Sequence, residues 1–309
     1  MNILIPGGSG QVGQILKRHF VAQGHDVIIL SRSGTAGSVR WDGNTLGDWS
    51  QHIDNADVVI NLAGRTVNCR YTEENLRQMM DSRVESTRVI GQAIEQSKTP
   101  PRVWLQMSTA TIYAHRFDAA NDEHSGIIGG NEPDAPAYWS RSIDIAKAWE
   151  HQLDLANTPQ TRKVALRTSM VMSPDPDGVF DVLHKLTGRW LGGSIAGGKQ
   201  FVSWIHEHDF VNAIQFLIDR DEVDGPINVC SPGPLPQQDF QRTLRSAMNV
   251  PIGLPATKWM AEIGAVFMKT DTELILKSRR VIPKRLLDAG FNFRYPNWAD
   301  AASELVART

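Results

Sequence analysis

The first thirteen residues contain the feature that most restricts the fold of this chain. The apolar run at residues 3–5 predicts a buried strand, and the sequence Pro6-Gly7-Gly8-Ser9-Gly10-Gln11-Val12-Gly13 follows it directly. Apolar side chains then recur at helical spacing as far as Phe20. A glycine-rich turn between a buried strand and a helix is typical of a phosphate-binding loop in a parallel α/β sheet.

Each glycine of this loop has a separate expected role. Gly7 permits the tight turn, Gly10 lets the backbone approach a pyrophosphate, and Gly13 lets the helix pack on the strand. The diphosphate would lie on the free N–H groups at the helix N-terminus. The alternative, a glycine-rich loop without a ligand, is disfavoured by the strand and helix around it. We therefore predict dinucleotide binding by the whole loop: Gly7, Gly8, Ser9, Gly10, Gln11, Val12 and Gly13.

The end of the second predicted strand, residues 26–30, indicates which dinucleotide binds. NAD-selective sites place Asp or Glu here, because a carboxylate accepts hydrogen bonds from the ribose hydroxyls. This chain has Ser31-Arg32-Ser33 instead. An arginine holds a 2′-phosphate through paired hydrogen bonds, whereas a carboxylate would repel it. We expect NADP(H) as the cofactor, and the alternative is that Arg32 is a solvated loop residue.

Strands and helices alternate along most of the chain. Apolar runs predict further buried strands at residues 58–62, 103–107 and 164–166. Helical patterns lie between them at residues 72–96 and 138–157. This alternation favours an α/β fold with a Rossmann-type doubly wound parallel sheet.

The alternation of strands and helices becomes irregular after the last of these strands, and this change suggests two domains. We assign residues 1–168 with 201–229 to an NADP-binding Rossmann domain. Residues 169–200 with 230–309 are expected to form a smaller C-terminal substrate lobe, because short helices and loops replace the alternation there.

The composition argues against several classes of function. A formal net charge of −2 over 309 residues gives no electrostatic case for binding nucleic acid or an anionic membrane. Two cysteines are too few for a disulfide framework and indicate a reducing compartment. We see no signal peptide before the first strand and no apolar run long enough to span a membrane. We expect a cytoplasmic protein that acts on a small molecule.

Motifs along nearly the whole chain resemble the extended short-chain dehydrogenase/reductase superfamily. They are most similar to its atypical "epimerase family protein" group, which ends in a small domain of unknown function. Pro6 departs from the threonine that is usual before the glycines. The resemblance implies a Rossmann domain with a C-terminal lobe and NADP(H) as cofactor, but it implies no particular reaction. The matching segments are residues 7–13, 61–64, 81–83, 149–150, 204–206, 281–291 and 293–296.

Further candidate residues come from this resemblance and from the ends of the predicted strands, where ligands of open α/β sheets bind. Cofactor contacts are expected from Leu62, Ala63, Gly64, Arg83, Ser108 and Arg167. The polar loop after residue 64 is expected to face the substrate. Candidate substrate contacts are Asn68, Arg70, Tyr71 and Trp204.

The resemblance also raises a problem for the chemistry. The superfamily moves the hydroxyl proton with a tyrosine four residues before a lysine, whose charge lowers the tyrosine pKa. Here the residue four positions after Tyr138 is Ser142, and the residue four positions before Lys147 is Ile143. Alignment on the Trp-Glu pair at residues 149–150 instead places Ser142 at the tyrosine position and Ala146 at the lysine position. We therefore expect a different proton donor.

Two hydroxyl-bearing residues after the strand at 103–107 are the catalytic candidates. Thr109 is expected to hydrogen-bond a substrate oxygen, and Tyr113 or His115 to supply a proton. The alternatives are a packed aromatic ring for Tyr113 and a solvated loop residue for His115. A thiolate at Cys69 is disfavoured, because no histidine lies nearby in sequence to act as its base. We predict no metal site, since the pattern at residues 206–210 ends in Phe where a zinc helix needs His.

Two functions remain open at this point. The first is an NADP(H)-dependent oxidoreductase or epimerase-like enzyme that acts on an unidentified small molecule. The alternative is a non-catalytic NADPH-binding sensor or interaction protein, which loss of the Tyr/Lys pair permits. The long loop at residues 114–137 favours the enzyme, because such loops and a C-terminal lobe together enclose a substrate.

Overall fold

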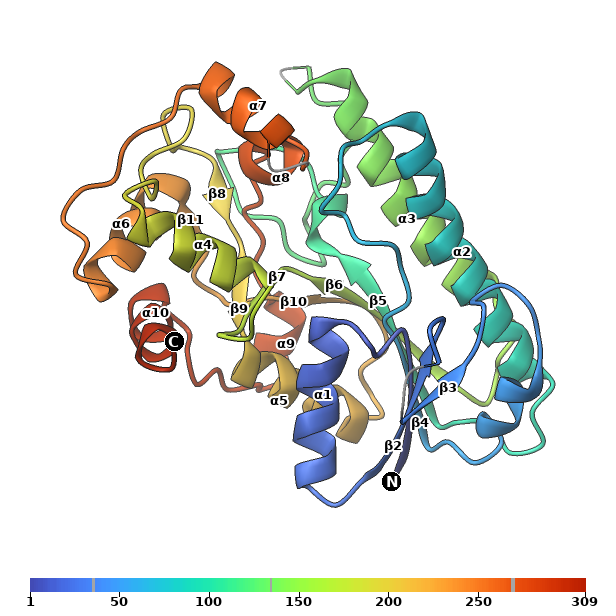
Figure 1. The fold of residues 1–309 in the computed structure, drawn as a ribbon. Coiled ribbons are helices and arrows are strands. Elements are labelled where there is room, and N and C mark those ends of the chain that lie inside the picture. Colours follow the sequence, from blue (N-terminus) through green and yellow to red (C-terminus); the bar gives the residue numbers. More distant parts are fainter. Residues whose placement is uncertain (35–36, 134, 268–269) are drawn as a thin grey trace.

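A seven-stranded parallel sheet forms the centre of the computed structural model, which describes residues 1–34, 37–133, 135–267 and 270–309 (Figure 1). The strand order is β10-β6-β5-β4-β1-β2-β3. The strands are β1 (Asn2–Pro6), β2 (Asp26–Ser31), β3 (Ser38–Arg40), β4 (Val58–Asn61), β5 (Val103–Thr109), β6 (Arg162–Thr168) and β10 (Gly225–Val229). This arrangement confirms the predicted doubly wound α/β fold.

Helices cover both faces of the sheet (Figure 1). One face carries α1 (Gln11–Ala22), α5 (Glu207–Asp219) and α9 (Lys284–Asp288), and the other carries α2 (Glu73–Glu95) and α3 (Ser140–Leu155). The central strands β1, β4, β5 and β6 have apolar runs because each of them contributes to both cores. Ile60 of β4 packs beneath α1 and α5, whereas its neighbour Val59 packs beneath α2 and α3.

The strand order reverses direction at β1, and this reversal positions the site. β1 pairs with β2 on one side and with β4 on the other, so that Ile3 faces Val27 and Val58. The connections from β1 and β4 leave in opposite directions at the carboxyl edge. In open parallel sheets, ligands usually bind in a crevice at such a reversal.

The C-terminal part of the chain has a second core of its own. Trp298 stacks on Phe240 with ring centroids 4.1 Å apart, and Trp204 lies against Trp298 at 4.9 Å. The elements around it are β7 (Met170–Met172), α4 (Val179–Gly188), β8 (Phe201–Val202), β9 (Trp204–His206), β11 (Leu235–Pro236), α6 (Gln237–Ala247) and α10 (Trp298–Ala307). The same part of the chain also contains α7 (Lys258–Phe267) and α8 (Glu273–Leu276). In the described part of the chain, no helix has the length and apolar character needed to cross a membrane.

Ser203 separates the short strands β8 and β9, and its hydroxyl donates a hydrogen bond to Arg279 O at 2.7 Å. One detail differs from the sequence-based division into domains. Leu286 and Phe291 pack in the core beneath the main sheet although the sequence division gives them to the C-terminal lobe. The amphipathic pattern shows that these side chains are buried but not which core receives them.

Candidate functional site

The glycine turn is tightly packed against the protein at Gly7 and Gly13 and is open at Gly10. Gly7 has φ +74°, and a Cβ there would lie 2.6 Å from Ala63 Cα. A Cβ at Gly13 would lie 2.4 Å from Gly8 Cα, so both positions require glycine. Gly10 differs, because the nearest atom to a Cβ there is Gly7 O at 4.0 Å. The turn is therefore open at the position where the pyrophosphate is expected.

The N-terminus of α1 offers donors to a ligand. Gly10 is the N-cap and supplies no side-chain oxygen, and no acidic residue lies in the first turn. The first N–H groups of a helix have no acceptor within the helix. The Gln11 amide nitrogen Nε2 is also buried without a hydrogen-bond partner among the described residues. These donors fit an anionic diphosphate.

Arg32 lies at the end of β2, beside the glycine turn. Gly7 N donates to Leu30 O at 2.9 Å, which ties the turn to this strand end. The Ser31 and Ser33 hydroxyls are hydrogen-bonded to each other at 2.8 Å. The Arg32 side chain is exposed, and no described residue pairs with its guanidinium. That guanidinium is therefore available to an anionic ligand at the edge of the crevice.

The segment at residues 62–64 lies against the glycine turn. Leu62 N donates to Pro6 O at 2.8 Å, and Ala63 N donates to the Asn61 side chain at 3.0 Å. Arg83 packs beneath this segment, with its guanidinium 4.9 Å from the centre of the Trp149 ring. Burial lowers the pKa of Arg83 to about 10. The structure thus places Arg83 under the predicted cofactor segment.

A buried network changes the interpretation of three predicted site residues. Arg167 donates two hydrogen bonds to the Glu150 carboxylate at 2.9 and 2.7 Å, and Ser108 donates a third at 2.6 Å. Arg167 also donates to the Tyr113 hydroxyl, which donates to Asn228 Oδ1, both at 2.9 Å. Tyr113 is only 2% exposed, and burial raises its pKa. The polar groups of Ser108, Arg167 and Tyr113 hold this network together, and the cofactor and catalytic contacts expected of these residues stay predictions.

Thr109 and His115 are the other two candidates from this part of the chain. Thr109 ends β5, and its oxygen accepts a hydrogen bond from Thr111 N at 3.1 Å, which leaves its hydroxyl hydrogen to donate. The His115 ring nitrogen Nδ1 accepts from Ser278 N at 2.7 Å, and the ring packs against Trp139. Thr109 thus keeps its predicted position at the sheet edge, whereas His115 anchors a C-terminal segment.

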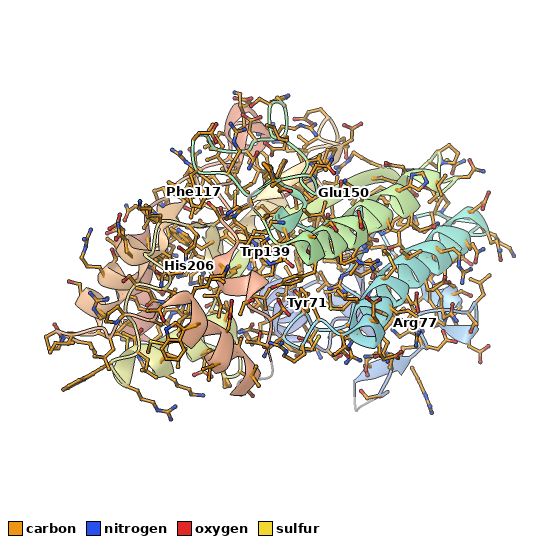
Figure 2. All side chains as sticks on the ribbon, turned by 90° about the horizontal axis from the view of Figure 1, so that it is seen from above. Tyr71, Arg77, Phe117, Trp139, Glu150 and His206 are labelled. Atoms are coloured by element: carbon orange, nitrogen blue, oxygen red, sulfur yellow. The ribbon has the colours of Figure 1, made fainter. Side chains whose placement is uncertain are left out.

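A cleft of about 690 Å³ lies between the loop before α2 and the C-terminal elements. Arg70 and Tyr71, two predicted substrate residues, line it, and Asn68 lies exposed on the same loop. Arg70 also donates to Thr270 O at 3.3 Å, across the cleft. Figure 2 shows Tyr71 at the boundary between the helices of the main domain and the C-terminal part. The cleft is thus positioned to admit a small molecule from the side of the C-terminal elements.

The structure argues against the predicted substrate contact of Trp204. Its side chain is 0% exposed in the C-terminal core, and its indole nitrogen donates to Gly233 O at 3.1 Å. A ligand cannot reach it without opening that core. The motif around Trp204 is therefore a packing element.

Sequence reasoning missed a group of ionisable side chains in and after α8. Lys277 Nζ donates to Thr111 O at 2.8 Å, and Arg279 Nε donates to the Thr111 hydroxyl at 3.1 Å. Glu273 is 1% exposed, and its Oε1 lies 2.5 Å from the Ser142 hydroxyl of α3. Burial raises the pKa of Glu273 and lowers that of Lys277 to about 8. The signal available in the sequence was the Glu-x-x-x-Lys spacing, which pairs two side chains on a helix.

The histidines at positions 206 and 208 are occupied by protein contacts. His206 Nε2 lies 2.8 Å from Glu304 Oε2, and burial lowers the pKa of His206 to about 4. Its ring stacks on that of Tyr295 at 4.1 Å, and on that of His208 at 5.1 Å. Across the parts of the chain that the structure describes, His, Cys, Asp and Glu side chains form no group of three able to hold a metal ion.

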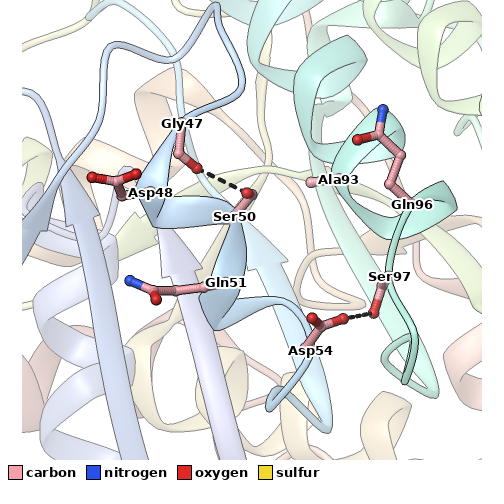
Figure 3. Close-up of a pocket in the computed structure, with 8 residues that line it drawn as sticks. All are labelled: Gly47, Asp48, Ser50, Gln51, Asp54, Ala93, Gln96 and Ser97. Carbon is pink, nitrogen blue, oxygen red and sulfur yellow. Dashed lines mark hydrogen bonds between the residues drawn. The ribbon is translucent and has the colours of Figure 1, made fainter.

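A second hollow, of about 350 Å³, is lined by residues 47–54 and by the end of α2 and the residues after it (Figure 3). Asp54 on its wall accepts hydrogen bonds from the Ser97 hydroxyl and from Lys98 N. Residue 54 precedes β4 and residue 97 precedes β5, so this hollow lies at the amino edge of the sheet. The glycine turn lies at the carboxyl edge, and the candidate site therefore does not include this hollow.

Comparison with known proteins identifies related sequences along nearly the whole chain. Residues 3–230 match the model of the NAD dependent epimerase/dehydratase family, and residues 256–305 match a domain of unknown function, DUF1731. Epimerase family protein YfhF of Bacillus subtilis (strain 168) is 28% identical over 314 residues, which cover 99% of this chain and 98% of that protein. Epimerase family protein SDR39U1 of Homo sapiens is 27% identical over 310 residues, which cover 99% of this chain and 100% of that protein.

Solved structures show the same relationship. Human epimerase family protein SDR39U1 (isoform 2), crystallised with NADPH, has a TM-score of 0.86 at 25% identity and covers 100% of both chains. The UDP-glucose 4-epimerase of Thermus thermophilus, in complex with NAD, has a TM-score of 0.72 at 15% identity over 99% of this chain and 98% of that one. At that identity the likeness shows the fold alone. The chain belongs to the NAD dependent epimerase/dehydratase family and carries the DUF1731 domain at its C-terminal end.

Proposed function

We propose that this protein is an NADP(H)-dependent oxidoreductase or epimerase-like enzyme that acts on a carbonyl or hydroxyl group of a small molecule. The observation that carries the proposal is Arg32, whose guanidinium is unpaired among the described residues and lies beside a glycine turn that is open at Gly10. The family relationship and the human relative crystallised with NADPH support the same cofactor.

The chain's own residues have separate roles in this proposal. The N-terminus of α1 holds the diphosphate, and Arg32 holds the 2′-phosphate. When bound, the nicotinamide accepts or supplies a hydride at the carboxyl edge of the sheet. The Thr109 hydroxyl donates a hydrogen bond to the substrate oxygen there, and the cleft beside Tyr71 admits the substrate. We place the reaction in the cytoplasm, since both cysteines are free thiols, as a reducing compartment permits.

Arg32→Ala tests the cofactor assignment. A guanidinium–phosphate pair is worth about 1.5–3 kcal/mol, or roughly one to two decades of affinity. The parent protein is therefore expected to bind NADPH at least about tenfold more tightly than NADH, and the variant to lose that preference. Fluorescence titration with both cofactors measures it. Arg242→Ala, an exposed arginine on α6, is the control and keeps the preference. Equal affinities in the parent protein would refute the assignment.

A further inference from the structure

Helix α7 exposes its large apolar side chains and buries small ones. Ala261 and Ala265 are buried, whereas Trp259, Ile263 and Val266 are exposed. The three exposed residues recur at helical spacing and therefore lie on one face of the helix. Surface helices of globular proteins normally do the reverse and turn their large apolar side chains toward the core. Figure 1 shows α7 at the edge of the C-terminal part, with α8 beneath it.

Two segments that lead to α7 also expose apolar side chains. Residues 190–196 and 252–256 lie side by side, since Leu254 N donates to Trp190 O at 2.7 Å. The second segment ends just before α7 begins. Exposed apolar side chains gathered in one region mark an interaction site. We call the following eight side chains, each between 43% and 62% exposed, the apolar patch: Trp190, Leu191, Ile252, Leu254, Trp259, Met260, Ile263 and Val266.

The charged side chains among these residues are mostly cations. Residues 189–199 and 245–266 contain four basic side chains and one carboxylate, that of Glu262. None of the four forms an ion pair with a described residue. The net charge of −2 is a sum over the whole chain, whereas this region is positive and suits an anionic partner. The four cations are Arg189, Lys199, Arg245 and Lys258.

A lipid surface with anionic headgroups matches both the apolar and the basic side chains. Helices that lie on membranes combine Trp and aliphatic residues with Lys and Arg, and they bury their apolar face at the boundary between headgroups and acyl chains. Tryptophan is enriched at that depth because its ring is amphipathic. A second copy of the chain fits less well. A two-fold interface pairs a surface with itself and would bring these cations against one another.

We propose that the apolar patch docks on a lipid bilayer with anionic headgroups, with α7 lying along the surface. Trp259 and Ile263 enter the acyl boundary, and Lys258 and the other cations contact headgroups. Glu262 and Val266 of the same helix line the cleft beside Tyr71, so docking brings the mouth of that cleft to the lipid. The proposal does not depend on the oxidoreductase function, and its tests need no substrate.

Sedimentation with lipid vesicles tests the proposal. The parent protein is expected to sediment with vesicles of phosphatidylglycerol and phosphatidylcholine in equal parts, and to stay in the supernatant with phosphatidylcholine alone. Ile263→Glu is expected to bind the mixed vesicles at least about tenfold more weakly, because burial of one isoleucine side chain is worth about 1.5–3 kcal/mol. Equal binding of the parent protein to both kinds of vesicle would contradict a role for the cations and overturn the proposal.

Val21→Glu is the matched control for the apolar substitution. Val21 lies on α1 and is 51% exposed, and Ile263 is 49% exposed. The control is expected to bind the mixed vesicles as the parent protein does. Because both positions are exposed, the melting temperatures of both variants should stay near the parent value, which separates loss of binding from loss of fold.

Lys258→Ala tests the contribution of charge. A cation near an anionic bilayer is worth about 1 kcal/mol, so this variant is expected to bind the mixed vesicles about fivefold more weakly. Lys98→Ala removes an exposed lysine after α2 and is the control, with unchanged binding expected. An equal loss in the two variants would show a general effect of net charge and would contradict docking through this surface.

Two further outcomes would overturn the proposal. One is a parent protein that stays in the supernatant with the mixed vesicles, and the other is unchanged binding by Ile263→Glu. Size-exclusion chromatography with light scattering identifies the alternative occupant. A parent dimer that Ile263→Glu converts to a monomer would show that a second copy covers α7, and it would also overturn docking on lipid. Affinity for NADPH is expected to be the same in all these variants, so the proposed function is tested separately.

Discussion

Gly10→Val is expected to weaken NADPH binding by about a hundredfold or more, equivalent to about 2.7 kcal/mol. The valine side chain would occupy the open side of the turn, where the pyrophosphate is expected to lie on the N-terminus of α1. The protein itself has room for the change, because only Gly7 O lies as near as 4.0 Å to the added Cβ, and the backbone φ of −76° suits any residue. Fluorescence titration measures the affinity, and a thermal melt without ligand checks the fold.

Gly13→Ala is the contrasting variant. Its methyl group would overlap Gly8 Cα at 2.4 Å, so we expect a lower melting temperature before any cofactor is added. The two variants thus distinguish a glycine that leaves room for the ligand, Gly10, from one that the packing of the protein requires, Gly13. If NADPH raises the melting temperature of Gly10→Val as much as that of the parent protein, the phosphates bind elsewhere.

Arg167→Ala is expected to cost about 3 kcal/mol of unfolding free energy, because it leaves the largely buried Glu150 carboxylate without its charge partner. Urea unfolding measures this change. The affinity for NADPH is expected to change only a few-fold, since the guanidinium is held by Glu150 and Tyr113. This outcome would distinguish the structural role from the cofactor contact that the sequence first indicated.

Arg116→Ala provides the comparison for that experiment. Arg116 also pairs with a carboxylate through two hydrogen bonds, to Asp118, but Asp118 is exposed and solvent screens the pair. Its removal is expected to change stability little. A large loss of NADPH affinity in Arg167→Ala, with unchanged stability, would contradict the role that we assign to the network.

The sequence was most informative where the determinants are local. The glycine turn could be predicted because turn, strand and helix lie within about twenty consecutive residues, and each glycine has a distinct steric reason. The sheet could be predicted because each of its central strands is buried on both faces and therefore contains an apolar run. Arg32 was identified by the same local reasoning, from its position at a strand end.

The sequence was least informative where a side chain's role depends on a distant partner. Arg167 stands near the end of β6 and Tyr113 follows β5 by four residues, where ligand-binding residues are common. Glu150 and Asn228, from other elements, form hydrogen bonds with them. Glu273 was missed for the same reason. Nothing near it in sequence shows that residue 142, at a separation of 131 positions, lies against its carboxyl group. Such pairings depend on tertiary contacts, and local patterns do not contain them.

Hydride transfer is the central claim of this account, and isotope transfer measures it most directly. The protein would be incubated with a reactive carbonyl compound and with NADPH that carries deuterium at the transferring position of the nicotinamide ring. Mass spectrometry of the product then shows where the deuterium is. We predict one deuterium on the carbon that was the carbonyl carbon. Tight NADPH binding without deuterium transfer to any carbonyl or sugar nucleotide would contradict the account and favour a protein that binds the cofactor without reaction.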